Sequence, residues 1–141
     1  MTNTPTNPKF FSQVVQLLQS SRSKVVQTIN QTMVLTYFEI GKMIVEEEQN
    51  GEERAEYGKK LLEDLSVLLT REFGKGFSKT NLKQMRQFYL IYSIGQTVSD
   101  QFNLSWSHYL KLMRIDNQNK RKFYEIEAFK NNWSIRELQR Q

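Results

Sequence analysis

Residues 61–92 read LLEDLSVLLTREFGKGFSKTNLKQMRQFYLIY, and this stretch decides what kind of fold the chain can form. Leucines recur at helical spacing, two glycines interrupt the pattern, and Ser78 then stands where a helix N-cap is favoured. The stretch predicts a helix over about 55–73, a stop at Gly74–Gly76 and a polar helix over about 79–94. This order is typical of a helix-turn-helix unit, although an ordinary amphipathic helix pair would look similar. The glycines need only end a helix, and we favour that role over anion binding.

Helical patterning continues on both sides of this stretch. Proline occurs only at Pro5 and Pro8, so nothing bars a helix from Lys9 onward. We expect helices over about 8–20, 22–49, 106–115 and 116–132, with a break near Ser20–Ser21 and a polar loop over 95–103. The fold class is therefore all-α, a multi-helix bundle containing a helix-turn-helix-like unit. We expect residues 1–8 to be a disordered tail and residues 9–141 to form a single helical domain.

The apolar positions of the expected helices predict their buried faces. The first expected helix has an apolar face that consists of Phe10, Phe11, Val14, Val15, Leu17 and Leu18. The longest helix is expected to bury a stripe that is also long enough to serve a dimer. The predicted core positions are Val26, Ile29, Met33, Tyr37, Ile40 and Ile44; then Leu61, Leu62, Leu65, Leu68, Leu69 and Phe73; then Leu82, Met85, Tyr89 and Tyr92, flanked by Phe88.

Composition excludes several classes of protein. The 141 residues contain no cysteine and a single histidine, so disulfide frameworks, thiolate metal sites and two-histidine metal sites are ruled out. The sequence has no P-loop, no dinucleotide-binding glycine pattern, no signal-peptide pattern and no apolar run of the roughly 20 residues that cross a bilayer. We therefore expect a cytoplasmic protein with no cofactor, no metal and no catalytic residue.

The positive charge lies in the second half of the chain. Residues 1–77 carry 9 Lys and Arg against 10 Asp and Glu, whereas residues 78–141 carry 11 against 5. A polyanion such as DNA would bind this half, and a solvated basic face is the alternative.

Candidate DNA-contacting residues follow from helix geometry. At 100° per residue, the polar side chains of the 79–94 helix fall opposite Leu82, Met85 and Tyr89, where lysine and arginine can reach phosphates and glutamine can read adenine. The candidates are Lys79, Thr80, Lys83, Gln84, Arg86 and Gln87, then Ser107, His108, Lys111 and Arg114, and finally the cluster Lys120, Arg121 and Lys122.

Three features have plainer interpretations. His108 has no carboxylate near it in sequence, so a structural role or a phosphate contact is favoured over catalysis. Trp106 is expected in the core rather than as a stacking platform. Glu46–Glu48 are expected to be solvated, at a helix end that disfavours them.

Several motifs together resemble a known family. They include Ile40-Gly41-Lys42, Arg54–Gly58, Phe73–Ser78, Asn81-Leu82, Met85–Tyr89, Leu104–Tyr109, Phe123-Tyr124 and Trp133–Leu138. In this order they resemble the N-terminal domain of the YhcG-like family of bacterial PD-(D/E)XK nucleases. The resemblance implies a helical DNA-binding module that precedes a separate nuclease domain.

The nuclease domain itself is not expected in this chain. No Asp or Glu is followed two positions later by Lys, which is the triplet that such nucleases use. The capping-box pattern Ser134–Glu137 starts a helix close to the last residue, so we expect further chain to follow.

Two functions are compatible with the sequence. In the first, the chain is a non-catalytic DNA-binding module that targets or regulates a nuclease domain or subunit. In the second, it is an interaction or dimerisation module without nucleic-acid contact. The expected partners are double-stranded or branched DNA, a second copy of the chain and a nuclease domain or subunit, with no membrane.

Overall fold

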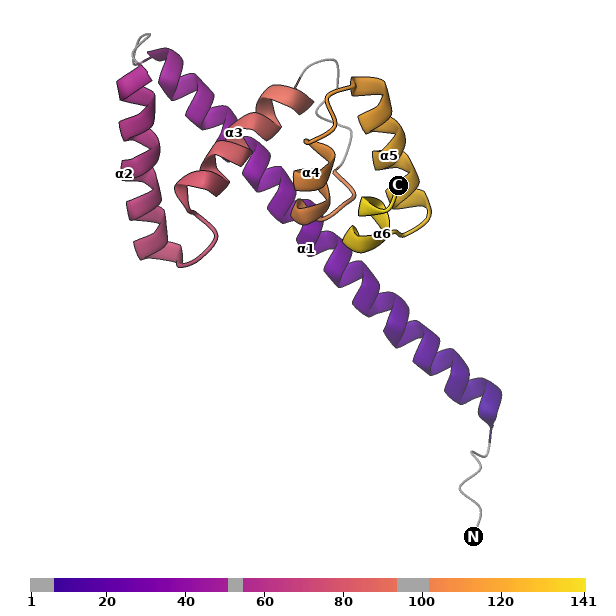
Figure 1. The fold of residues 1–141 in the computed structure, drawn as a ribbon. Helices are drawn as coiled ribbons and strands as arrows, with labels where there is room; N and C mark the ends of the chain where they lie inside the picture. The colour runs from indigo at the N-terminus through magenta and orange to yellow at the C-terminus, as the bar shows by residue number, and fades with distance from the viewer. Residues whose placement is uncertain (1–6, 51–54, 94–101) are drawn as a thin grey trace.

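The computed structural model describes residues 7–50, 55–93 and 102–141, and this part of the chain is helical without any strand (Figure 1). The expected all-α class is confirmed. Most of the expected tail (1–6), the helix end at Gly51 and most of the expected loop (94–101) lie outside the described residues. The helices are α1 (Pro8–Asn50), α2 (Ala55–Phe73), α3 (Lys79–Tyr92), α4 (Trp106–Leu112), α5 (Gln118–Lys130) and α6 (Ile135–Gln139).

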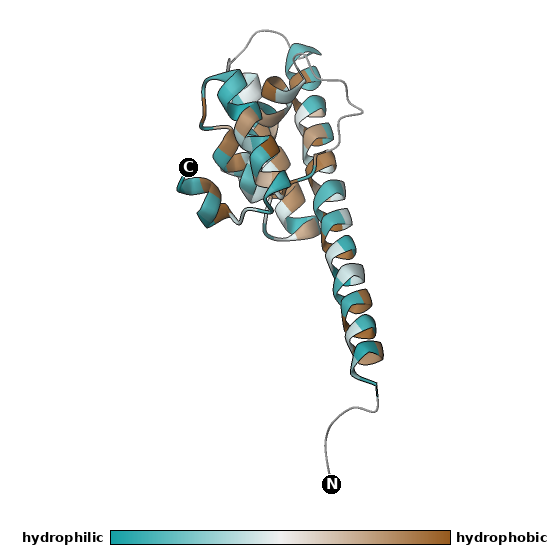
Figure 2. Cartoon of the chain, turned by 90° about the vertical axis from the view of Figure 1, so that its right-hand side faces the viewer, coloured by the Kyte–Doolittle hydropathy of each residue, from teal (hydrophilic) through white to brown (hydrophobic). Residues whose placement is uncertain are grey.

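Helix α1 runs without interruption through Ser20 and Ser21, so the break expected there is wrong. Serine costs only about half a kcal/mol relative to alanine inside a helix, and neither proline nor glycine occurs between Lys9 and Ile40. The helix starts as expected, because the Asn7 side chain accepts the Phe10 N–H at 3.1 Å. The N-terminal half of α1 extends as an arm beyond the rest of the fold (Figures 1 and 2).

The C-terminal half of α1 is the centre of the core, but its most buried line is not the predicted one. Val34, Phe38, Gly41 and Val45 are buried against α3 and the α4 region. Of the predicted stripe, Ile44 is buried and contacts Leu62, Leu82 and Met85, Tyr37 and Ile40 are half-buried, and the residues before them are exposed. The helix is apolar on two sides here, and sequence periodicity alone selected the less buried side.

Helix α2 lies at the edge of the core and buries few of its side chains. Of its predicted stripe only Leu62 is fully buried, while Leu68 and Phe73 are 43% and 70% exposed. Leu61, Leu65 and Leu69 are half-buried, so the predicted stripe is confirmed only in part, because α2 packs against α1 and α3 on one side only (Figure 1).

Helix α3 buries Leu82, Met85, Phe88 and Tyr92. The prediction is confirmed except that Phe88, not Tyr89, is the fully buried ring. The Phe88 ring lies 4.8–6.0 Å, centroid to centroid, from five other aromatic rings, which fills the space between α1, α3 and α4. Those rings are Phe38, Tyr92, Phe102, Trp106 and Tyr109.

The turn between α2 and α3 has the conformation that its sequence requires. Gly74 and Gly76 have φ of 82° and 109°, which confirms their role as a helix stop. The Ser78 hydroxyl accepts the Asn81 N–H at 3.1 Å and caps α3 as predicted. The Asn81 side chain donates back to the Gly76 carbonyl and accepts the indole N–H of Trp106 at 3.0 Å. The turn is thus tied to α4 as well as to α3.

The last three helices are short and each begins at a side-chain cap. Ser105 caps α4, Asn117 caps α5, and Ser134 forms the predicted capping box with Glu137 at the start of α6. Helix α5 begins two residues later than predicted, because the Asn117 side chain accepts the Lys120 N–H at 2.9 Å and makes Asn117 the N-cap. No helix in the described ranges is long and apolar enough to cross a membrane.

Candidate nucleic-acid interface

The outer face of α3 carries the predicted polar side chains. Thr80, Lys83 and Gln87 are exposed on the side opposite Leu82 and Met85, as helix geometry predicted. Gln84 is half-buried at the edge of this face. These side chains lie outside the core, so they are available to a partner.

Two of the predicted α3 cations are held by ion pairs within the fold. The Lys79 ammonium lies 3.0 Å from a carboxylate oxygen of Glu63 on α2, and the Arg86 Nε lies 2.5 Å from a carboxylate oxygen of Glu48 on α1. The expectation that Glu46–Glu48 are all solvated is therefore wrong for Glu48, which is half-buried. Both pairs join α3 to a neighbouring helix and offset part of its positive charge.

The Lys79–Glu63 pair also acts on the carboxyl group. The hydrogen bond from Lys79, followed by the charge of the same ammonium, lowers the pKa of Glu63. Glu63 is solvent-exposed, so the pair is weak in solution and reversible. Lys83 has no such pair within the described part of the chain, which makes it the α3 cation most open to an external anion.

The second group of candidates surrounds α4. Ser107 and Arg114 are exposed, and Lys111 is half-buried with no ion pair among the described residues. On the inner side of this helix Tyr109 is fully buried and donates its hydroxyl hydrogen to Glu125 at 3.1 Å. Burial, then the nearby Glu125, raises the pKa of Tyr109, which stays a neutral donor.

The third group is the basic cluster at the start of α5. Lys120 and Lys122 are exposed, whereas Arg121 is turned inward. The guanidinium of Arg121 donates to the Ile115 carbonyl at 3.0 and 2.7 Å and to the Asp116 carbonyl at 3.3 Å. Arg121 therefore holds the α4–α5 turn together, whereas the two lysines make no ion pair with any described residue.

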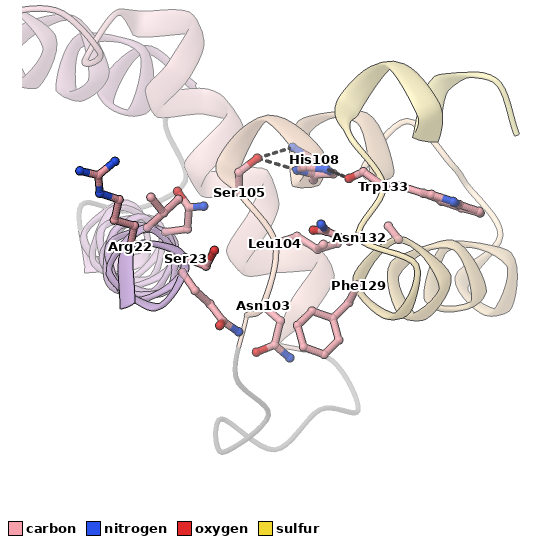
Figure 3. A pocket seen from close by; sticks show the side chains of 13 residues that line it. Arg22, Ser23, Asn103, Leu104, Ser105, His108, Phe129, Asn132 and Trp133 are labelled. Carbon is pink, nitrogen blue, oxygen red and sulfur yellow. Dashed lines mark hydrogen bonds between the residues drawn. The ribbon is translucent and has the colours of Figure 1, made fainter. Parts of the chain in front are cut away.

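His108 is part of a closed hydrogen-bond arrangement rather than a free base (Figure 3). Its Nε2 lies 2.8 Å from the Trp133 carbonyl, which can only accept, so Nε2 carries the hydrogen. Its Nδ1 then accepts the Ser105 hydroxyl hydrogen at 2.6 Å, while the Ser105 oxygen accepts the His108 N–H. The His108 side chain therefore links α4 to the segment before α6. This is the kind of structural role that was favoured over catalysis from the sequence.

A pocket of about 550 Å³ lies beside His108 (Figure 3). Its walls are α1 from Arg22 to Asn30, the stretch 103–105 and the α5–α6 corner from Ala128 to Trp133. No group of three or more His, Asp or Glu side chains suited to a metal occurs among the described residues. The polar groups that line the pocket are amides and hydroxyls together with Arg22 and His108, and no carboxylate is among the lining residues.

Two important residues were not singled out for these roles from sequence. Asn81 bridges the turn and Trp106, and Gly41 lies where a Cβ would stand 2.1 Å from the Met85 carbonyl oxygen. A glycine in the middle of a long helix was an available signal for a close helix crossing. Trp106 is half-buried against Tyr37 and Phe88, so the expectation of a core role is confirmed.

Comparison with known proteins supports the resemblance seen in the motifs. The family model of the DUF1016 N-terminal domain matches residues 13–141. A protein of Escherichia coli (strain K12) with the name "Putative nuclease YhcG" is 37% identical over 158 aligned positions, which cover 91% of this chain. The chain spans 42% of the length of that relative. No solved structure matches this chain.

Proposed function

This chain belongs to the DUF1016 N-terminal domain family, and from that premise we propose that it is a non-catalytic DNA-binding module that delivers a nuclease domain to its target. The relative that it resembles is longer and carries a nuclease name, so cutting would belong to the remainder of such a protein. Binding would belong to the N-terminal domain that this chain forms.

The main support for this proposal is the outer face of α3, where exposed cationic and amide side chains point out of the fold and have no partner among the described residues. Lys83 and Gln87 share this face with Thr80. Lysine binds phosphate as a point charge, and glutamine can pair with the edge of adenine. A duplex offers both kinds of group at the spacing of one helix face.

The arrangement of α2, the glycine turn and α3 supports the use of α3 as a recognition helix. Gly74 and Gly76 reverse the chain, and α3 follows with its core side held by α1. In helix-turn-helix proteins the second helix enters the major groove while the first crosses the backbone. The lysines of α5, Lys120 and Lys122, would add phosphate contacts outside the groove.

Titration of the chain against a labelled duplex at several salt concentrations tests the proposal. The phosphate-contact variant is Lys83→Ala, Lys120→Ala and Lys122→Ala together, which removes three exposed cations that no ion pair within the described residues uses. Each lost phosphate contact should reduce the slope of log affinity against log salt by about 0.9. The slope measured for the triple variant should therefore be smaller than that of the parent by up to about 2.7.

The matched control removes three exposed lysines from the other half of the chain, namely Lys42→Ala, Lys59→Ala and Lys60→Ala. It changes net charge equally and should keep the parent slope. Absence of binding by the parent chain at low salt would sink the proposal. If the slope of log affinity against log salt falls equally in the two variants, the net charge of the chain, and not this surface, attracts DNA.

A second function, protein interaction, is favoured by a different observation. The α1 arm exposes apolar side chains that DNA would not bind. Interaction through the arm is compatible with DNA binding through α3, since the two surfaces lie on different elements.

A further inference from the structure

The arm of α1 exposes an unusually apolar surface. Ten of its side chains between Phe10 and Met33 expose between 39% and 66% of their surface. They are Phe10, Phe11, Val14, Val15, Leu17, Leu18, Val25, Val26, Ile29 and Met33. Figure 2 shows the arm reaching away from the other helices, with hydrophobic residues along it. Most of the stability of a helix in a protein comes from packing of its apolar face rather than from intrinsic helix propensity, so a partner that covers the arm would stabilise it.

These side chains share one half of the helix. At 100° per residue all ten fall within about 180° of the circumference, and the other half carries Gln13, Gln16, Ser20, Ser23 and Gln27. The buried Val34, Phe38 and Val45 continue the line of this polar half, which therefore faces the body of the protein. Gln31 confirms the direction, because it donates to the Asn103 side chain at 3.0 Å. Apart from Val26 at its edge, which lines the pocket beside His108, the apolar half points away from the body and is not covered by another element among the described residues.

The exposed area is that of a protein interface. Ten half-exposed side chains of this size present on the order of 900 Å², more than the 300–600 Å² of the largest patch on a typical monomer. A stable interface takes about 800 Å² from each partner. The arm alone is sufficient for an interface of that size.

The apolar pattern is complementary to itself in one orientation. When two arms run antiparallel with paired residue numbers that add to 43, Phe10 lies opposite Met33, Val14 opposite Ile29 and Leu18 opposite Val25. Leu17 then lies opposite Val26, and Arg22 lies opposite Ser21 rather than opposite another charge. Val14, Leu18, Val25 and Ile29 form the seam, at the spacing of four and seven that packed helices use.

We propose that the arm of α1 is a dimerisation element and that its occupant is the antiparallel arm of a second copy of this chain. The expected interface lies at Phe10–Met33, not over the whole stripe from Val26 to Ile44, because the core of the same chain covers Ile44. A membrane surface fits less well. The polar half of the arm is mostly glutamine and serine, with Lys9 and Lys24 as its cations, whereas surface-binding helices are rich in lysine and arginine there. The proposal does not depend on DNA binding.

Sedimentation equilibrium of the chain at about 1–100 µM tests the proposal. The parent should have the mass of a dimer. Leu18→Glu with Val25→Glu places four carboxylates in the seam of a dimer and should raise the dissociation constant at least about 100-fold. Gln13→Glu with Gln16→Glu makes the same charge change on the polar half and should remain dimeric. All four positions are exposed in the monomer, so circular dichroism should show folded helices in every variant.

Cross-linking tests the orientation, since the chain has no cysteine of its own. A mixture of Leu18→Cys and Val25→Cys proteins should form the mixed disulfide under mild oxidation, while neither protein alone should cross-link to itself. Efficient Leu18→Cys self-cross-linking would indicate parallel arms and overturn the register. A parent that remains monomeric at 100 µM would overturn the dimer, and so would a monomer that binds anionic phosphatidylserine vesicles through the arm.

Discussion

At Gly41 the backbones of two helices come into contact. A Cβ built there would lie 2.1 Å from the Met85 carbonyl oxygen and 3.1 Å from the Tyr89 Cβ. Backbone atoms cannot rotate away as the end of a side chain can, so α1 and α3 cross at this distance only because residue 41 has no side chain.

Gly41→Ala should therefore destabilise the fold. The two helices would have to separate and lose contacts around Val34 and Phe88, which we expect to cost about 2–3 kcal/mol of the free energy of unfolding. Urea denaturation followed by circular dichroism measures this loss.

Gly58→Ala on α2 is the matched control. Its Cβ would meet the Glu48 carboxylate at 2.9 Å, the mobile end of a side chain. Because alanine is also favoured over glycine in a helix by about 1 kcal/mol, this variant should be neutral or more stable. Equal destabilisation by the two substitutions would contradict the role given to the crossing.

At the scale of the element, α3 has two kinds of cation. Lys83 has no ion pair within residues 7–50, 55–93 and 102–141, whereas Lys79 and Arg86 are paired with Glu63 and Glu48. A phosphate would have to compete with a carboxylate for each paired cation. If α3 binds DNA, its own neighbouring helices restrain its affinity.

Glu48→Gln with Glu63→Gln should strengthen DNA binding. Release of Lys79 and Arg86 adds up to two phosphate contacts, so the slope of log affinity against log salt should become steeper by up to about 1.8. Glu39→Gln with Glu72→Gln removes two exposed carboxylates with no ion pair among the described residues, and this control should change the slope much less. If the first variant binds no better than the control, the ion pairs do not limit binding.

At the scale of the whole molecule, the chain corresponds to a part of its longer relative. It covers 42% of the E. coli protein and lacks any Asp or Glu followed two positions later by Lys. The isolated chain should therefore leave supercoiled plasmid uncut in magnesium or manganese, as judged by gel electrophoresis. Metal-dependent nicking that disappears when one of its carboxylates is replaced would contradict this prediction.

The sequence by itself determined where most helices begin, whereas α3, α4 and α5 end two or three residues earlier than predicted. Caps at Ser78, Ser105 and Ser134 and the glycine turn after Phe73 act through hydrogen bonds and backbone angles within a few residues. The residues that form such a cap or turn are neighbours in the sequence, so the sequence alone shows them. The bounds of α2 and the starts of α3 and α4 were therefore predicted correctly. The exposed side chains of α3 also followed from helix geometry alone.

The tertiary structure decided which faces are buried and which cations are free. The side of α1 that enters the core depends on the position of α3. On α3, Phe88 is fully buried and Tyr89 is not, because the rings that surround Phe88 come from α1 and α4. The Arg86–Glu48 pair joins residues 38 apart in sequence, and the Gln31–Asn103 hydrogen bond joins residues 72 apart. Periodicity describes one helix at a time, so it cannot choose between two apolar faces or supply a distant partner; only the packing of the helices against one another does that.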